Sequence, residues 1–531
     1  MRKFTISVFL ISILVSCSAS KNIPPSINAT ETPTTFVEPT FTPTPLFTPT
    51  PQPIPLPASY GPDQFPQDYN PLTGQRVADP ASLNIPAVLV SVSHFPPEAR
   101  PQAGFSFAPF VYEYFITEGA TRHLAVFYGE SPKPESPLHG GCEIRKEPFV
   151  QTQNILGNRV WLDANQNGIQ DPGEGGVGGI CVNLYDANNS LRQQTTTDSN
   201  GYYAFNVESG KYTLEIERPT WLEFTQKNVG DENQDSDVDQ ATGRSDAVDV
   251  TSSLLYLDAG LVLPPNIPPP LDSSSKLPDA VVGPVRSGRL LYRFIGAFYQ
   301  NSCLIFASAD EEVLPQLPGC ATVAHTTAGG GAMLPIERMN KIAQQNSKNS
   351  TNFNYASNLF ADTPSARGVP AIELQEYWAY LNQSKWMYDA AAGAWWRYVD
   401  KSNPATAGVL HPEVDRLNGR QLMFENVIVM FAPHTVIKPT IVDIDLRQGA
   451  LGNAYLFRDG QMYKIHWSTV GGEYEQKTGL RRPMHFVNLD GTPAALKPGH
   501  TWVIILDMQS YLKDLSSGKW LARFIAPAGA K

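Results

Sequence analysis

Hydrophobic residues in this chain gather in short runs rich in Val, Ile and aromatic side chains, a pattern that predicts strands over much of its length. The runs at 87–93 (AVLVSVS), 110–115 (FVYEYF) and 123–128 (HLAVFY) have the composition of buried strands. Runs of the same kind, among them 453–467 (NAYLFRDGQMYKIHW) and 501–507 (TWVIILD), dominate from residue 421 onward. Both ends of the folded region are therefore predicted to supply sheet strands.

The pattern changes between residues 157 and 262, where shorter runs such as 202–207 (YYAFNV) and 211–217 (KYTLEIE) alternate with Asn, Asp and Gly turns. About seven short strands with turn signals between them predict an Ig-like β-sandwich. Proline-rich segments at 131–137 and 263–278 lie on either side. Because exposed loops tolerate whole inserted domains best, the sandwich is predicted to be an insertion into another domain.

Helical signals are fewer. The segment 285–300 (VRSGRLLYRFIGAFYQ) predicts a helix whose apolar face includes Leu290, Phe294 and Phe298. Residues 335–383 are predicted to carry helical and irregular segments. The expected fold is a multidomain α+β chain: an α/β host domain, interrupted by the inserted β-sandwich and followed by a β-rich C-terminal domain.

The N-terminus reads as an export signal. Arg2 and Lys3 precede an apolar run at 4–15, which has the length of a signal-peptide core and is too short to span a bilayer. The run ends in Leu-Val-Ser-Cys at 14–17, which resembles the lipobox of bacterial lipoproteins, in which the cysteine is lipidated. Cys17 is the predicted lipidation site, and the alternative is an ordinary signal peptide with an incidental cysteine. The proline- and threonine-rich residues that follow predict an extended stalk.

These observations give a predicted order of parts along the chain. It runs as follows: signal peptide 1–17, Pro/Thr-rich stalk 18–59, host domain first part 60–135, inserted sandwich 150–263, Pro-rich joint 264–279, host domain second part 280–415, and C-terminal β-rich domain 416–531.

The net charge limits the possible binding partners, and the cysteine content limits the possible disulfides. The net charge of −11 argues against nucleic-acid binding, because no basic stripe is present to replace counterions. Four cysteines remain after Cys17, and they allow three pairings. Cys142–Cys181 and Cys303–Cys320 are favoured, because each pair is close in sequence or spans one module edge. The alternative is four free buried thiols.

The strongest chemical motif is DANQNGIQDPGE at 163–174, which fits the calcium-loop pattern D-x-[DN]-x-[DN]-G-x₅-E. Calcium takes about six to eight oxygen ligands, and the spacing brings successive side chains around one centre as the chain wraps. The alternative is a solvated turn without metal. The predicted calcium ligands are Asp163, Asn165, Asn167, Ile169 through its carbonyl, Asp171 and Glu174.

This region resembles the SdrD B-like repeats of Gram-positive surface adhesins, through its first block at 157–186 and through the blocks 195–216 and 231–246. The resemblance implies a module that calcium makes rigid. It also implies a second calcium site in an acidic loop, for which a metal-free exposed loop is the alternative. The residues of this second site are Asp231, Asn233, Asp235, Asp237 and Asp239.

The flanking parts resemble the YerB-like lipoproteins, through NPLTG at 70–74, RPQAG at 100–104, GPVRSGR at 283–289 and PGHTW at 498–502. Three arginines lie on these blocks or beside them, and arginine grips phosphates and carboxylates in a bidentate way. A site for an anionic envelope ligand is therefore one hypothesis. The other is a structural Arg–Glu network in which the nearby Glu113 and Glu118 take part. The three candidate anion-binding residues are Arg122, Arg286 and Arg289.

The leading interpretation is a non-enzymatic surface lipoprotein with calcium as its cofactor. It would be extracytoplasmic, lipid-anchored to the cell membrane or surface, and would interact with cell-wall or surface glycans or proteins. The alternative is a cell-wall or glycan-acting enzyme that uses Arg, Glu and His groups of the YerB-like domain. The sequence contains no H-E-x-x-H, G-x-S-x-G or Walker motif, and no catalytic residue is assigned.

Overall fold

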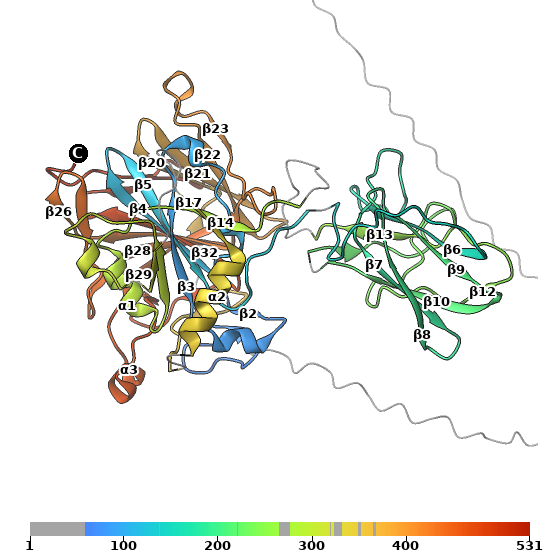
Figure 1. Ribbon diagram of the computed structural model, residues 1–531. Helices are drawn as coiled ribbons and strands as arrows, with labels where there is room; N and C mark the ends of the chain where they lie inside the picture. The colour runs from blue at the N-terminus through green and yellow to red at the C-terminus, as the bar shows by residue number, and fades with distance from the viewer. Residues whose placement is uncertain are drawn as a thin grey trace, which may run out of the picture. The chain divides into compact units, whose positions relative to one another are not determined.

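The computed structural model describes residues 59–136, 138–219, 221–264, 277–318, 320–322, 332–348, 352–364 and 368–531 (Figure 1). Cys17 and all of the predicted stalk except residue 59 lie outside this part of the chain. Within the described ranges, none of the helices has the length and apolar character needed to cross a membrane.

The host is built on one large sheet to which both ends of the chain contribute. Strand β4 (Phe110–Thr117) lies between β5 (Ala120–Phe127), its antiparallel neighbour in sequence, and β32 (Thr501–Asp507), a parallel neighbour almost 400 residues further on. The parts predicted as 60–135 and 416–531 therefore share one sheet. In order, the path of the 13-stranded sheet is β16 (Ala321–Thr322), β15 (Cys303–Phe306), β3 (Val88–Ser93), β5 (Ala120–Phe127), β4 (Phe110–Thr117), β32 (Thr501–Asp507), β25 (Asn426–Ala432), β28 (Leu451–Arg458), β29 (Gln461–Ser468) and β19 (Val369–Pro370), with β14 (Val281–Val285), β17 (Ala332–Pro335) and β30 (His485–Asn488) off the path.

A second host sheet has seven strands and packs on the large one. Their buried residues belong to a single hydrophobic core, which includes Trp386 and Trp395 of the second sheet and Trp502 of the first. In order, the second sheet comprises β23 (Leu410–Pro412), β22 (Ala394–Asp400), β21 (Asn382–Asp389), β20 (Glu373–Ala379), β34 (Lys519–Arg523) and β33 (Tyr511–Asp514), with β24 (Met423–Phe424) beside β22. Short pairs complete the host: β1 (Tyr69–Asn70) with β2 (Gln75–Arg76), β18 (Leu359–Phe360) with β31 (Ala495–Leu496), and β26 (His434–Lys438) with β27 (Ile441–Ile444).

Alternation along β4 explains how the large sheet is covered on both faces. Successive side chains of a strand point to opposite faces. Tyr112 and Tyr114 reach α1 (Tyr292–Phe298), where their hydroxyl groups hydrogen-bond to Tyr299 and Tyr292. Glu113, between them, points the other way and contacts β22 of the second sheet. Helix α1 thus covers one face and the seven-stranded sheet covers the other.

The insert has two four-stranded sheets around a core of its own, as a β-sandwich requires. Both sheets supply buried side chains to that core, among them Val182 and Leu214 from one and Val160 and Leu261 from the other. The sheets, drawn in green in Figure 1, are β12 (Val248–Val250), β10 (Gly210–Glu217), β7 (Cys181–Asp186) and β8 (Leu191–Thr196), and β11 (Glu223–Phe224), β13 (Ala259–Val262), β6 (Asn154–Leu162) and β9 (Tyr202–Val207).

The host is more β-rich than the α/β domain expected from the sequence. The α-helices among the described residues are α1, α2 (Ile336–Ser347) and α3 (Glu473–Thr478). The helix predicted over 285–300 begins only at Tyr292, because the backbone before it is bonded elsewhere: Arg286 N–H donates to Ser91 and Gly288 N–H to Ser308. The buried residues of the helix are Tyr292, Ile295 and Phe298. Of the predicted face, Phe298 is thus buried, Leu290 is buried but precedes the helix, and Phe294 is half-buried.

Two disulfides join the cysteine pairs favoured from the sequence, so these thiols are not free. Cys142, in the segment before β6, is bonded to Cys181 at the start of β7, with 5.7 Å between the Cα atoms. Cys303, at the start of β15, is bonded to Cys320, with 5.3 Å between the Cα atoms. Each disulfide thus links a connecting segment to the first residue of a strand.

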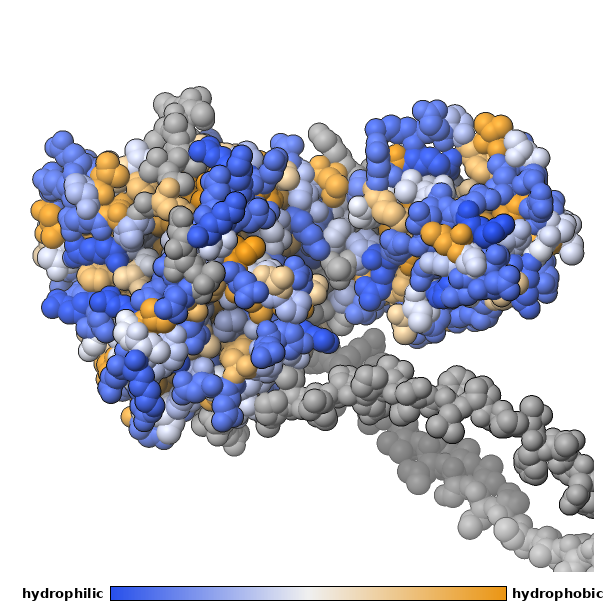
Figure 2. Space-filling view, turned by 60° about the horizontal axis from the view of Figure 1, so that its bottom comes forward, coloured by the Kyte–Doolittle hydropathy of each residue, from blue (hydrophilic) through white to orange (hydrophobic). Residues whose placement is uncertain are grey.

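The molecular surface is mainly polar. Figure 2 shows hydrophobic residues scattered among hydrophilic ones on the face it displays, without one large apolar patch. Exposed apolar side chains such as Val150, Leu255 and Leu489 lie in different parts of the sequence. Single exposed apolar residues are normal on folded proteins and do not by themselves mark a binding surface.

Candidate functional site

The predicted calcium loop connects β6 to β7, and Asp163 at its first position holds the loop together. The Asp163 side chain is almost fully buried, with 1% exposed. Its carboxylate accepts hydrogen bonds from the backbone of Gly168 at 2.8 Å and from the Thr225 hydroxyl at 2.6 Å. Gly168 has a φ of 80°, a conformation that suits glycine, so the chain can turn sharply there.

The other predicted ligand side chains point to the same loop interior. The amides of Asn165 and Asn167 both donate to one oxygen of Asp171, at 2.7 and 2.8 Å. The two oxygens of Glu174 accept from the backbone of Ala164 and Asp171, at 2.8 and 3.1 Å. Two carboxylates and two side-chain amides are thus gathered above the buried Asp163. Within the described residues, no group of three or more His, Cys, Asp or Glu side chains is arranged so that it could hold a metal, and calcium remains a prediction.

The acidic loop at 231–239 divides into two parts. Asp231 and Asp239 are exposed and accept hydrogen bonds within local turns, from Asn233 and Thr242 respectively. Asp235 is 6% exposed, and one of its carboxylate oxygens is buried without a hydrogen-bond partner. Asp237 pairs through the backbone with Asp258, which comes just before β13.

Asp258 was not identified from the sequence, because it lies about 20 positions from the acidic run, in a stretch that reads as a strand. Burial raises the pKa of Asp237 and of Asp258 to about 7, and the neighbouring carboxylates add to this effect. Desolvation together with like charges favours the protonated form of a carboxyl group. A cation in this place would relieve both effects.

The calcium-free insert is therefore expected to lose stability as the pH rises from about 4 to about 8. A carboxyl whose folded-state pKa lies above its unfolded value binds more protons when folded, so its contribution is present at low pH and is lost as pH rises through the folded pKa near 7. Thermal melts of metal-free fragment 136–263 at pH 5 and pH 8 measure this, with the higher melting temperature expected at pH 5. Asp237→Asn should reduce the difference, whereas Asp249→Asn, at an exposed position of β12, should leave it unchanged. Equal melting temperatures in the unmodified fragment would contradict the assignment.

The host core contains a cluster of charged side chains that the sequence did not reveal. The Arg397 guanidinium on β22 lies 2.8 Å from Glu113 on β4, 3.0 Å from Glu376 on β20 and 2.6 Å from Glu413. All four side chains are at most 3% exposed. The rings of Trp386 and Trp502 flank the guanidinium, and their indole N–H groups donate to Glu376 and Glu113.

One arginine cannot neutralise three carboxylates. The pKa values of Glu113 and Glu376 shift in opposite directions as a result. Burial opposes the charge of Glu113, but Arg397, His123 and Trp502 overcome that effect and lower its pKa to about 2. Burial raises the pKa of Glu376 to about 7, and Arg397 offsets this only in part. The cluster therefore retains a proton on Glu376 below neutral pH. Because no substrate can reach it, we interpret it as a structural link between the two sheets.

The three arginines proposed to bind an anion come together in the structure. Arg122, buried on β5, donates from Nη1 to the carbonyl of Ser287 at 3.4 Å, and Ser287 lies between Arg286 and Arg289 in the chain. The predicted alternative, a network with Glu113 and Glu118, is wrong: Glu113 pairs with Arg397, and Glu118 pairs with Lys531 at 2.9 Å.

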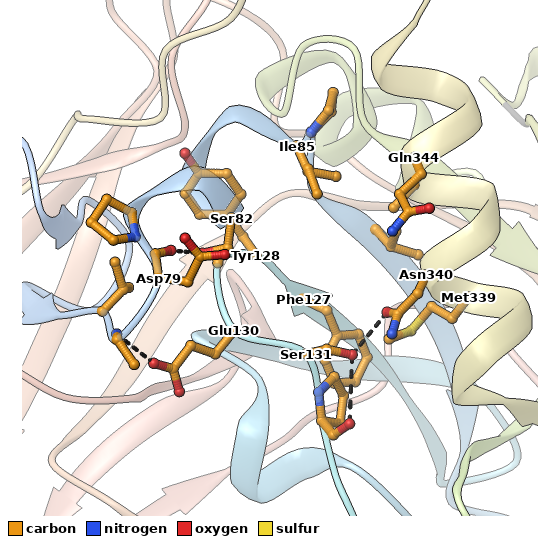
Figure 3. A pocket seen from close by; sticks show the side chains of 18 of the residues that line it. Asp79, Ser82, Ile85, Phe127, Tyr128, Glu130, Ser131, Met339, Asn340 and Gln344 are labelled. Carbon is orange, nitrogen blue, oxygen red and sulfur yellow. Dashed lines mark hydrogen bonds between the residues drawn. The ribbon is translucent and has the colours of Figure 1, made fainter. Parts of the chain in front are cut away.

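An open groove of about 870 Å³ lies between η1 (Pro80–Asn84), the end of β5 and α2 (Figure 3). Several polar side chains along it already have partners. Asp79 caps η1, Glu130 accepts from the backbone of Ala78 at 2.8 Å, and Ser131 donates to Asn340 of α2 at 2.8 Å. We assign no ligand to this groove.

Comparison with known proteins places the three parts in families. Residues 72–139 match the N-terminal domain and residues 374–503 the C-terminal domain of a protein of unknown function, DUF3048. Residues 154–261 match the SdrD B-like domain. A crystal structure of the YerB protein from Bacillus subtilis aligns with a TM-score of 0.45 and 16% sequence identity, over 82% of this chain and 96% of that one.

The insert is similar to parts of several staphylococcal proteins. It is 38% identical over 109 residues to serine-aspartate repeat-containing protein F and 42% identical over 92 residues to a fibrinogen-binding protein, both from Staphylococcus epidermidis. It is 40% identical over 96 residues to a bone sialoprotein-binding protein from Staphylococcus aureus. These matches cover 17–20% of this chain and only 6–8% of the relatives.

These matches define a mostly β, multidomain protein with a small inserted β-sheet domain. The chain carries the N- and C-terminal domains of the DUF3048 (YerB-like) family with an SdrD B-like domain inserted between them, which confirms both resemblances found in the sequence. Its disulfides and its adhesin-like domain indicate an extracytoplasmic protein.

Proposed function

We propose that this chain is an exported lipoprotein, anchored through Cys17, that acts in envelope or cell-surface interaction and carries a calcium-stabilised spacer. The similarity of the insert to a domain of staphylococcal surface proteins is the observation that carries the proposal. The two disulfides and the lipobox-like sequence at 14–17 add support, because both belong to exported proteins.

The calcium-loop motif at 163–174 and the buried acids around Asp237 support calcium as the stabilising ion. Without a cation, like-charged side chains repel one another in the folded state. Calcium at both places would neutralise this repulsion and fix the loops between strands, which suits a spacer that must hold its shape.

Ligand binding is proposed for the host rather than for the insert. Two relatives are named for binding fibrinogen and bone sialoprotein, but this chain corresponds to only 8% of either. An adhesin insert would bind cell-surface material as an excised fragment. We expect fragment 136–263 not to bind, in a pull-down assay, surface extracts that the full chain binds.

No observation favours the enzymatic alternative. An enzyme of that kind would need Glu and Arg side chains that its substrate can reach. The charged cluster of the host core does not offer this, because the side chains of Glu113, Glu376 and Arg397 are at most 1% exposed. A glycan could not reach them without separation of the two host sheets.

Fractionation of producing cells tests the anchor. The unmodified chain is expected in the membrane fraction, and Cys17→Ser is expected to move it to the soluble or secreted fraction, because the acyl chains supply the membrane affinity. Ser20→Ala, three residues further on, is the matched control and should leave the chain in the membrane fraction. Membrane association of the Cys17→Ser chain equal to that of the control would show that the anchor assignment is wrong.

A further inference from the structure

The loop 286–289 holds two arginines in fixed positions beside a third. Its backbone is bonded on both sides, because Arg286 N–H donates to Ser91 at 2.8 Å and Ala307 N–H donates to the Arg286 carbonyl at 2.9 Å. A Cβ at Gly288, between the arginines, would lie 2.4 Å from Cδ1 of Leu317, so a larger residue there would displace that side chain. The loop therefore holds Arg286 and Arg289 near Arg122 of β5.

Arg122 is buried with little to satisfy it. The residue is 3% exposed, and the one hydrogen bond that its side chain makes with the described residues is a long one, 3.4 Å, from Nη1 to the Ser287 carbonyl. Its Nε is buried without a partner, and so is the Nε of Arg289. A buried donor of a charged group that has no partner destabilises the folded state, so such groups call for an explanation.

The three arginines also lack carboxylate partners. Among the described residues, none forms an ion pair with an acid, whereas the nearby Arg293 does so with Asp443 at 2.6 Å. Burial lowers the pKa of Arg122 to about 10, and repulsion from Arg289 and Arg286 contributes, yet the group stays protonated at neutral pH. Three positive charges therefore lie in one region without an ion-pair partner among the described residues.

A cavity of about 340 Å³ has Arg289 in its lining, whereas Arg122 and Arg286 lie behind the residues that line it. Ser287 and Tyr114 line it as well, together with apolar side chains of β4 and β27 such as Phe115 and Ile441. The lining includes one carboxylate, Asp310, which accepts a hydrogen bond from the backbone of Glu312 at 3.0 Å. A small ligand can thus reach Arg289 from solvent.

We propose that Arg122, Arg286 and Arg289 form a binding site for a phosphate group in the host domain. Guanidinium groups bind phosphate oxygens through paired, charge-assisted hydrogen bonds, which would satisfy the unpaired Nε atoms. A phosphate with two negative charges offsets the three positive charges better than a carboxylate with one. The group can come from free phosphate or from the headgroup of a membrane lipid. This site deepens the envelope-interaction role proposed above, but it depends neither on the lipid anchor nor on calcium.

Two binding measurements on the full chain with Cys17→Ser, which excludes the anchor, test the site. The first is calorimetric titration with inorganic phosphate, and the second is sedimentation with vesicles of phosphatidylcholine, with and without phosphatidic acid. Arg286→Gln and Arg289→Gln, both at half-buried positions, are each expected to weaken binding about tenfold or more through loss of charged hydrogen bonds. Arg338→Gln, which removes an equal charge from an exposed position of α2, should bind like the parent.

The outcomes separate the two sources of phosphate. Binding of inorganic phosphate that weakens in the two loop variants supports a site for free phosphate. Binding restricted to vesicles with phosphatidic acid, and lost in the same variants, supports a lipid headgroup. Absence of both, or equal loss in Arg338→Gln, overturns the proposal. Circular dichroism verifies that each variant is folded. The outcomes of the phosphate titration and the vesicle sedimentation are independent of the fractionation test of Cys17.

Discussion

Replacing Arg397 with alanine is expected to destabilise the host by about 3–5 kcal/mol, the usual cost of removing one partner from a buried ion pair. The change would leave Glu113, Glu376 and Glu413 buried, hydrogen-bonded in part, and without a counter-charge. It would also remove the guanidinium packed against Trp386 and Trp502. Denaturant unfolding, followed by tryptophan fluorescence, measures the loss.

Two comparisons show whether charge is the cause. Arg523→Ala on β34, where the guanidinium stacks on Tyr377 at a partly exposed position, should cost far less, about 1 kcal/mol or below. The penalty of Arg397→Ala should also shrink as the pH falls, because the orphaned carboxylates can take up protons. A penalty that does not change with pH would mean that lost packing, rather than uncompensated charge, dominates.

Calcium is expected to raise the melting temperature of the insert on the order of 10 °C or more. At a concentration 100 times Kd, one site adds about 2.7 kcal/mol, and about 1 kcal/mol moves the melting point of a domain near this size by roughly 4–8 °C. Fragment 136–263 suits the test, because it has its own core and keeps the Cys142–Cys181 disulfide. Its melting is compared in millimolar calcium and in excess chelator.

Variants distinguish the loop from general ionic effects. Glu174→Gln should reduce the calcium-induced shift, since Glu174 is the predicted bidentate ligand and calcium prefers charged oxygens. Glu208→Gln, which removes one charge from an exposed position just after β9, should leave the shift intact. If calcium changes the melting point of neither parent nor variants, the loop is a turn only, and the spacer role loses its physical basis.

Both results would assign separate roles to the two parts of the chain. The insert would depend on an external ion that is abundant outside cells, whereas the host would depend on its own buried charges and on the packing of two sheets. Removal of calcium would then destabilise the insert. The host would keep its structure, including the three arginines Arg122, Arg286 and Arg289.

Local patterns in the sequence determined a large part of the structure. The strands at 87–93, 110–115 and 501–507 could be predicted because buried strands need continuous runs of β-branched and aromatic residues. The loop between β6 and β7 could be predicted because its Asp, Asn and Gly residues follow one another in the chain, and calcium binding there stays a prediction. Both disulfides agree with the pairing favoured from sequence proximity.

Only the tertiary structure decided the contacts between distant residues. Glu113 and Arg397 are 284 positions apart, and nothing in the local pattern of either residue indicates that two sheets bring them together. Likewise, Asp258 N–H donates to the Asp237 carboxylate and Asp237 N–H donates to the Asp258 carbonyl, although the two residues lie in separate segments, and β4 pairs with β32. The sequence determined which residues would be buried and where the chain would turn. Burial in a shared core determined which charges would meet, because a buried charge must find its partner in space rather than along the chain.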